Sequence, residues 1–155
     1  MVILRQARAG DIPAIRELAL EALARTPFAD VEFDTGLFNQ ELLASMRSPN
    51  RFLRVAENDR GEIVGVLLGE VGRIYGWAKA MAATDRLFYV SEEKGMGCGR
   101  EMLKAFLQWA RARTEVVVIS MQLGSQVGDW QRVGRLYERA GLKLIGGIYQ
   151  ERIVR

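Results

Sequence analysis

The chain has 155 residues, of which 49% are hydrophobic and 26% are charged, and its formal net charge is +3. This length fits a single domain, residues 1–155, with a core of its own. The sequence contains no histidine and one cysteine, which excludes an internal disulfide, a Cys/His zinc site and Ser-His-Asp or Cys-His catalysis. No metal site is expected, and acid–base chemistry must come from carboxylates, tyrosine, lysine, the backbone or water.

The positive charge is spread along the chain among acidic residues. A nucleic-acid-binding protein normally carries a basic cluster with interleaved aromatic residues, so we expect no nucleic-acid partner. No apolar run approaches the roughly 20 residues that cross a bilayer, and Arg5 and Arg8 interrupt the N-terminus where a signal peptide would have its apolar core. We therefore expect no membrane partner and a cytoplasmic location.

The first half of the chain predicts a strand, two helices and a β-hairpin. Residues 1–8 alternate loosely, as a strand does. A helix is expected from Asp11, a favourable N-cap, to about residue 25, and a second helix from 35 to 47. Strands are expected at 51–57 and 62–71, with a turn of Asn, Asp, Arg and Gly between them.

Two aromatic segments are candidates for a substrate-binding surface. Phe28 and Phe33 lie on the connection between the two helices, among acidic residues. Tyr75 and Trp77 flank Gly76 on a loop that precedes the next strand. Aromatic side chains in such places either line a binding cleft or fix the connection to the core, and the sequence leaves both readings open.

The stretch from 85 to 111 organises the rest of the chain. A buried strand is expected at 87–90, followed by a short polar turn and the glycine-rich segment 94–99. Apolar residues then recur with helical spacing at Met102, Leu103 and Phe106, which predicts an amphipathic helix to about residue 112. The glycine-rich loop therefore lies at the N-terminus of a helix.

This placement suits an anion, because the first turn of a helix leaves backbone N–H groups unpaired and carries a partial positive charge. Glycines at 95, 97 and 99 let phosphate oxygens approach the backbone, and Lys94 adds a charge at the rim. The alternative is that the glycines only make a tight connection between strand and helix. The loop alone does not decide between the two.

The last third predicts a strand, a helix and a final strand or hairpin. Residues 115–121, EVVVISM, are typical of a fully buried strand, which indicates a central strand parallel to its neighbour. A helix is expected from 128 to 140, with Gly141 at its C-terminal end. Residues 142–155 are expected to add the last strand or hairpin to the sheet.

Two motifs in this order resemble the GNAT superfamily of N-acetyltransferases. Residues 94–99, KGMGCG, are similar to the family's acetyl-CoA signature R/Q-x-x-G-x-G/A, with lysine in the first place. Residues 136–142, LYERAGL, resemble its L-Y-E-K-x-G-F segment. The resemblance covers nearly the whole chain. It implies an α/β (α+β) fold in which a mixed, mostly antiparallel central sheet of six or seven strands is flanked by four helices.

The resemblance also implies a site for acetyl-CoA. The strand that ends at Val90 would pair its backbone with the pantetheine arm, and the amides of residues 96–100 would hold the pyrophosphate. Cys98 is expected to turn toward the core as a small packing residue. The implied cofactor-binding residues are Phe88, Tyr89, Val90, Lys94, Gly95, Met96, Gly97, Cys98, Gly99 and Arg100.

The implied reaction is direct transfer of the acetyl group to a primary amine of a small molecule or peptide. Tyr137 would lie near the thioester sulfur, where its hydroxyl can protonate the departing thiolate. The amine must lose a proton, and the candidate bases are Asp85 and Glu70. The alternative is a CoA-binding sensor or interaction module without catalysis. The sequence leaves open a homodimer in which the last strand is exchanged or paired between chains.

Overall fold

The computed structural model describes residues 1–95, 97–123 and 129–153. Its elements in chain order are β1 (Val2–Gln6), the 3-10 turn η1 (Ala9–Asp11), α1 (Ile12–Ala24), α2 (Thr35–Arg47), β2 (Arg51–Asn58), β3 (Ile63–Arg73), the 3-10 turn η2 (Ile74–Gly76), β4 (Met81–Val90), α3 (Cys98–Arg111), β5 (Val116–Ser120) and α4 (Trp130–Arg139). None of the helices in these residues is long and apolar enough to cross a membrane.

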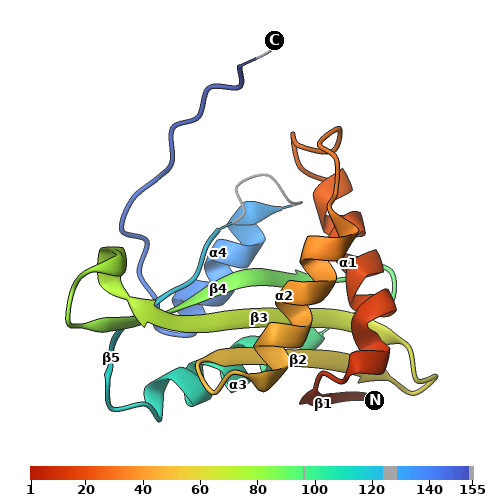
Figure 1. Ribbon diagram of the computed structural model, residues 1–155, viewed down its shortest axis with the longest axis horizontal. Coiled ribbons are helices and arrows are strands. Elements are labelled where there is room, and N and C mark those ends of the chain that lie inside the picture. The colour runs from red at the N-terminus through yellow and green to blue at the C-terminus, as the bar shows by residue number, and fades with distance from the viewer. Residues whose placement is uncertain (96, 124–128, 154–155) are drawn as a thin grey trace.

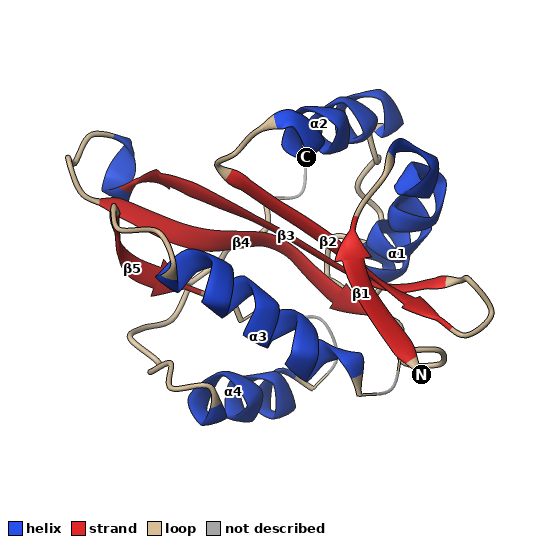
Figure 2. Ribbon diagram, turned by 90° about the horizontal axis from the view of Figure 1, so that it is seen from below, coloured by secondary structure: helices blue, strands red, loops and turns tan. Residues whose placement is uncertain are grey.

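The strands form one mixed sheet in the order β1-β2-β3-β4-β5, in which the first four are antiparallel and β5 runs parallel to β4. Helices α1 and α2 cover one face, and α3 and α4 lie on the other (Figures 1 and 2). The predicted α/β (α+β) class and the four flanking helices are confirmed. The predicted six or seven strands are wrong for the described residues, which contain five.

Each face of the sheet has its own apolar core, because side chains on a strand alternate between faces. On the face of α3, Phe106 packs on β2 and β3 and is fully buried. On the face of α1 and α2, Leu42 and Ile15 are fully buried against Val66 of β3. Cys98 is 4% exposed within the first of these cores, which confirms its packing role.

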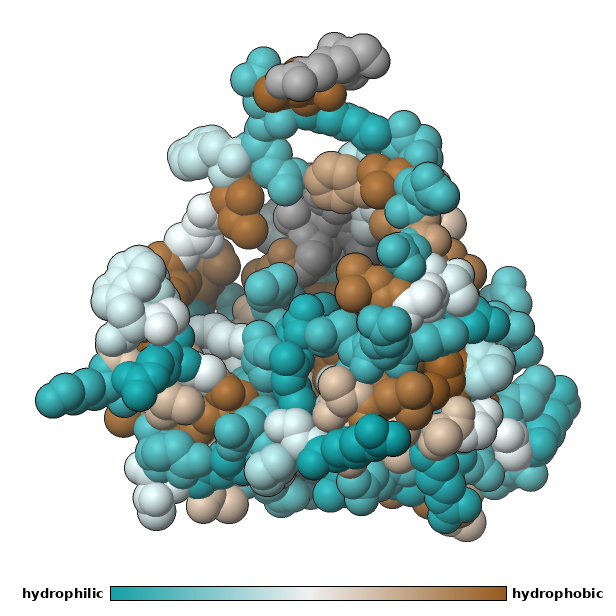
Figure 3. Space-filling view, in the orientation of Figure 1, coloured by the Kyte–Doolittle hydropathy of each residue, from teal (hydrophilic) through white to brown (hydrophobic). Residues whose placement is uncertain are grey.

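The predicted last strand is absent, since residues 142–153 adopt no regular secondary structure. Leu142 still packs against the core, but much of the segment after it extends away from the sheet, and its apolar side chains from Leu144 to Ile153 are exposed (Figure 3). Near its end, Arg152 forms an ion pair with Asp30 at 2.8 Å and lies over the ring of Phe28. The segment is apolar enough to be a strand, but a strand also needs a partner edge, and it pairs with none.

The position of β5 also corrects a prediction. Its parallel pairing with β4 is confirmed, but the strand is at the edge of the sheet rather than at its centre. Val117 is 65% exposed and Val118 is 42% exposed. The apolar run predicted a strand buried on both faces. In the structure β5 is the edge strand, and residues 142–153 do not pair with it.

Candidate functional site

A cavity of about 710 Å³ opens where β4 and β5 separate. Their pairing ends at Thr84 and Ser120, although β4 continues to Val90. The backbone of residues 85–90 therefore has no strand partner on the β5 side within the described chain. Phe88 and Tyr89 both line the cavity, although neighbouring residues of a strand point to opposite faces. The cavity thus reaches both faces of the sheet.

The first turn of α3 forms one wall. Gly97 is the N-cap residue, with a left-handed φ of 89°, and no side chain of the described residues caps the helix. The N–H groups of Gly99 and Arg100 lack partners within the helix, and both residues line the cavity. This wall therefore offers unpaired backbone donors at the positive end of a helix.

The glycines of this loop have different physical roles. A Cβ on Gly95 would lie 2.4 Å from Val90 Cγ1 and 2.8 Å from the carbonyl oxygen of Val64, so packing requires glycine there. A Cβ on Gly99 would meet nothing closer than 3.7 Å. Gly95 therefore holds the loop against the sheet, whereas Gly99 leaves room above the helix start.

Most of the residues that the resemblance implies for the cofactor meet at this cavity. Phe88, Tyr89, Val90, Gly95, Gly97, Gly99 and Arg100 line it. Cys98 faces the core, and Lys94 forms an ion pair with Glu62 at 3.3 Å instead of lining the cavity. Met96 lies outside the described residues.

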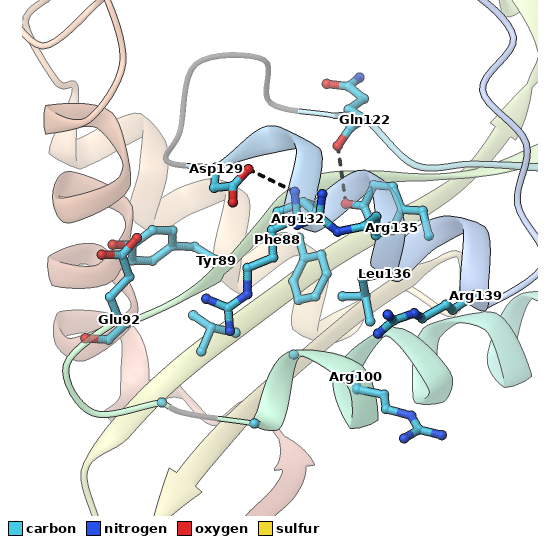
Figure 4. A pocket seen from close by; sticks show the side chains of 17 residues that line it. Phe88, Tyr89, Glu92, Arg100, Gln122, Asp129, Arg132, Arg135, Leu136 and Arg139 are labelled. Atoms are coloured by element: carbon cyan, nitrogen blue, oxygen red, sulfur yellow. Dashed lines mark hydrogen bonds between the residues drawn. The ribbon is translucent and has the colours of Figure 1, made fainter.

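Helix α4 forms the opposite wall and brings residues that the sequence analysis missed. Asp129 caps the helix by accepting the N–H of Arg132 at 3.0 Å. Arg132, Arg135 and Arg139 recur at helical spacing on the face toward the cavity, and Arg100 adds a further guanidinium from α3 (Figure 4). The i, i+3, i+7 spacing was visible in the sequence and would have predicted a basic helix face.

Tyr137 is on the same face of α4 and is 6% exposed. Its hydroxyl donates to the carbonyl oxygen of Gln122 at 3.3 Å. Burial, together with the nearby charge of Asp85, raises the pKa of the Tyr137 phenol above its usual value of 10.0. The hydroxyl therefore stays protonated at neutral pH.

A β-bulge decides the direction of Asp85. In the register of β3 and β4, Leu68 pairs with Leu87 and Gly69 pairs with Asp85, so Arg86 has no opposite residue. The extra residue reverses the alternation, and Asp85 points to the same face as Phe88. Its carboxylate accepts the N–H of Gln122 at 2.7 Å.

The side chain of Asp85 is not among the described residues that line the cavity. The residue is 6% exposed. Burial raises the pKa of its carboxyl from 3.8 to about 6, although the hydrogen bond from Gln122 opposes the shift. Asp85 lies behind the cavity wall and is linked to Tyr137 in the wall, because both side chains hydrogen-bond to the backbone of Gln122.

Glu70 lies on the other face of the sheet, away from the cavity. It pairs with Arg51 at 2.7 Å and lies 3.7 Å from Arg86. Glu41 of α2 joins the same two arginines. The carboxylate is therefore held in a surface ion-pair network.

The end of the cavity near α1 carries a second polar pair that the sequence analysis did not identify. The hydroxyl of Tyr89 donates to Glu21 of α1 at 2.7 Å. Next to it, Arg25 of α1 and Glu92 form an ion pair at 2.6 Å. The pKa of the Tyr89 phenol is raised by burial and by its bond to Glu21.

The four aromatic candidates for substrate binding do not line this cavity. Tyr75 and Trp77 stack on each other, 79% and 81% exposed, at the opposite end of β4 from the glycine loop. Phe33 packs against Phe38 with ring centroids 5.0 Å apart, and Phe28 contacts Arg152. The described residues also contain no group of three or more Cys, Asp or Glu side chains placed to hold a metal ion.

An open strand edge beside an unpaired helix N-terminus suits an extended ligand with an anionic end. The sequence matches the model of the acetyltransferase (GNAT) family over residues 13–142. The chain therefore belongs to the GNAT acetyltransferase family. A search of curated proteins found no match.

Three solved structures illustrate the range of proteins with this fold. A transcriptional regulator from Bacillus halodurans is 21% identical, with a TM-score of 0.69, and the match covers 99% of this chain and 100% of that one. Glucosamine-6-phosphate N-acetyltransferase from Arabidopsis thaliana is 11% identical, with a TM-score of 0.69 and 99% of both chains covered. Ribosomal-protein-alanine N-acetyltransferase from Brucella melitensis is 13% identical, with a TM-score of 0.67 and 99% of both chains covered. At these identities the similarity establishes the fold alone.

Proposed function

We propose that the protein is an acetyl-CoA-dependent N-acyltransferase that transfers an acetyl group directly to a primary amine. The observation that carries this proposal is the shared cavity of the free β4 edge, the first turn of α3 and Tyr137. Membership of the GNAT acetyltransferase family supports acyl transfer in general. The donor and the acceptor are our inference from the site.

The residues of the cavity fit acetyl-CoA. The backbone of residues 85–90 offers N–H and C=O groups to the amides of a pantetheine arm. The amides of Gly99 and Arg100 suit its diphosphate, and the space above Gly99 lets phosphate oxygens approach the helix. When bound, acetyl-CoA supplies the activated thioester, and the chain's own residues position it and move protons.

Tyr137 is the proposed general acid. Tyr137 lines the cavity, and its hydroxyl keeps its proton at neutral pH because burial raises the pKa of the phenol. As the amine nitrogen forms its bond to the acetyl carbon, the carbon–sulfur bond breaks and the thiolate needs a proton. Tyr137 Oη can supply that proton from the α4 wall.

Asp85 is the proposed base, and Glu70 is the alternative. With a pKa of about 6, Asp85 is mostly ionised at neutral pH and still basic enough to take a proton. Its place behind the cavity wall requires that a water molecule carry the proton from the amine. Glu70 is less suited, since Arg51 and Arg86 compete for its charge and it faces the other side of the sheet.

The acceptor would be the amine of a small molecule or peptide, entering from the side of α1. Glu21, Tyr89 and Glu92 lie at this end of the site, opposite the arginines of α4. Anionic groups favour a cationic amine there, while the arginines favour the phosphates of the donor. The two fold neighbours with named acceptors act on a sugar phosphate and a ribosomal protein, so the fold is compatible with both classes.

The test is release of free CoA thiol from acetyl-CoA in the presence of a panel of primary amines and peptide N-termini. We expect thiol release that depends on at least one amine and yields the acetylated product by mass spectrometry. The control is a panel of tertiary amines, whose nitrogen has no N–H to lose after attack on the thioester and therefore cannot form a stable amide. Binding of acetyl-CoA without thiol release across the panel would contradict the catalytic proposal.

A second candidate is a CoA-binding sensor or interaction module without catalysis. The observation in its favour is that neither Asp85 nor Glu70 is among the described residues that line the cavity. Such a module would gain stability from acetyl-CoA but show no amine-dependent thiol release. The same assay therefore separates the two candidates.

A homodimer and a cytoplasmic location remain predictions. The apolar side chains exposed along residues 142–153 and on the outer edge of β5 support self-association, because exposed apolar surface favours an interface. Sedimentation equilibrium measures the mass directly. A mass of one chain at all concentrations would contradict the dimer.

A further inference from the structure

The cavity carries more positive charge than its glycine loop accounts for. Arg132, Arg135 and Arg139 of α4 and Arg100 of α3 all line it. In the described part of the chain, none of these guanidinium groups forms an ion pair. The acidic residues of the cavity wall are already engaged, since Glu92 pairs with Arg25 and Asp129 caps α4.

Like charges three and four residues apart on a helix repel one another. Arg135 and Arg139 form no ion pair within the described residues, so these arginines favour an anionic ligand, which would reduce the repulsion. Guanidinium groups also match phosphate oxygens in a bidentate geometry that ammonium groups lack. The arginine face of α4 thus has the chemistry of a phosphate site.

The part of this face that carries Arg135 and Arg139 is separate from the backbone donors at the start of α3. The pKa of the Glu92 carboxyl is lowered mainly by its bond to Arg25, and the charge of Arg132 adds to the effect. Arg132 therefore lies near the turn that precedes the glycine loop. Arg135 and Arg139 follow along α4, about 5 and 10 Å further along its axis at 1.5 Å per residue. Figure 4 shows the side chains of Arg132 and Arg139 extending from α4 toward the side formed by the loop and α3.

Coenzyme A also has two separate anionic groups, a diphosphate next to the pantetheine arm and a phosphate monoester on the ribose. We propose that Arg135 and Arg139 bind the 3′-phosphate of the ribose, while Arg132 and the first turn of α3 hold the diphosphate. This inference rests on the proposed function, because it assigns part of the same cavity. It makes the α4 face a determinant of selectivity for CoA over carriers that lack the 3′-phosphate.

The test compares the binding of CoA and 3′-dephospho-CoA by isothermal titration calorimetry at fixed ionic strength. The two ligands differ only in the phosphate that the arginines are assigned to bind. We expect the wild-type protein to bind CoA about tenfold to a hundredfold more tightly, the range for charge-assisted hydrogen bonds. Raising the salt concentration should narrow this preference, because the guanidinium groups are exposed.

The variants are Arg135→Gln and Arg139→Gln, which remove one charge each and keep a polar side chain. Each variant should lower the affinity for CoA about tenfold and leave the affinity for dephospho-CoA within about twofold of the wild-type value. The matched control is Arg47→Gln, which makes the same charge change on the last turn of α2. It should leave both affinities unchanged, which excludes an effect of net charge.

An equal loss of affinity for CoA and for dephospho-CoA in the α4 variants would overturn the assignment, since the arginines would then hold the diphosphate or the adenine. Equal wild-type affinity for CoA and dephospho-CoA would overturn it as well. Both outcomes leave the proposed function standing, because CoA still binds. Failure of the wild-type protein to bind either ligand would instead overturn the proposed function together with this inference.

Discussion

Asp85 and Glu70 lie on neighbouring strands of the same sheet but on opposite faces. Asp85 is buried on the side of α3 and α4, and it accepts a hydrogen bond from the backbone of Gln122 at 2.7 Å. Glu70 faces α2 and is held between Arg51 and Arg86. Asp85 is shielded from solvent and has no cationic partner among the described residues. Glu70 is partly exposed to solvent and has two cationic partners.

The difference shows what makes a carboxylate suitable for proton transfer. Burial without a cation raises the pKa of Asp85 to about 6, which lets the group exchange a proton near neutral pH. Glu70, held between Arg51 and Arg86, instead connects β2, β3 and β4 through its ion pairs. The face of α3 and α4 is therefore the one on which we expect chemistry.

The largest expected effect on this face is that of Tyr137→Phe. The substitution removes the proposed acid and keeps the aromatic ring, so kcat should fall about a thousandfold, within the range for general acid catalysis. The affinity for CoA, measured by calorimetry, should stay within about twofold, because the ring still lines the cavity. Wild-type kcat in this variant would reduce Tyr137 to a packing residue.

Asp85→Asn should have the next largest effect. As the proposed base, Asp85 would act through a water molecule from behind the cavity wall, so we expect its loss to lower kcat about a hundredfold. In the wild-type protein, kcat should rise with pH as the carboxylate ionises near pH 6 and then level off. The variant should lack this rise. A rise near pH 6 that persists in Asp85→Asn would mean that another group is the base.

Asp85→Asn should also stabilise the protein, in a way that depends on pH. The folded pKa of about 6 exceeds the usual 3.8, so ionisation of Asp85 opposes folding. This cost is absent below about pH 4, grows as the pH rises through 6 and is constant above it. Asparagine cannot ionise, so the variant should gain about 3 kcal/mol at pH 8 and almost nothing at pH 4. Urea unfolding at the two pH values measures this, and equal gains would refute it.

Glu70→Gln gives the smallest expected effect and serves as the matched control for Asp85→Asn. Both substitutions remove a carboxylate and keep its shape. The partly exposed ion pairs of Glu70 should contribute only about 0.5 kcal/mol to stability, and kcat should change less than about threefold. If instead Glu70→Gln abolished turnover and Asp85→Asn did not, the roles of the two faces would be reversed.

Local sequence patterns were enough to predict the elements that depend on short-range spacing. The helix from Thr35 to Arg47 is where its apolar spacing indicated. Helix α3 begins at Cys98, directly after the glycine loop. Periodicity and capping residues act within a few turns, so the sequence alone carries this information.

Features that depend on pairing between distant segments were not predictable in the same way. The direction of Asp85 is set by the bulge at Arg86, which exists only in the register of β3 and β4. Residues 142–153 have the apolar character of a strand but pair with no strand of the described residues, although the outer edge of β5 is not covered. Likewise, the spacing of the α4 arginines was visible, but only the packing of α4 beside the glycine loop brings them to the cavity.

We propose that the cavity between β4, α3 and α4 binds acetyl-CoA. Thermal unfolding with and without acetyl-CoA tests this most directly, because a ligand that binds only the folded state raises Tm. At a concentration about 100 times its Kd, acetyl-CoA should stabilise the protein by about 2.7 kcal/mol, which corresponds to a rise in Tm of about 5–10 °C. An unchanged Tm at millimolar acetyl-CoA would contradict the account.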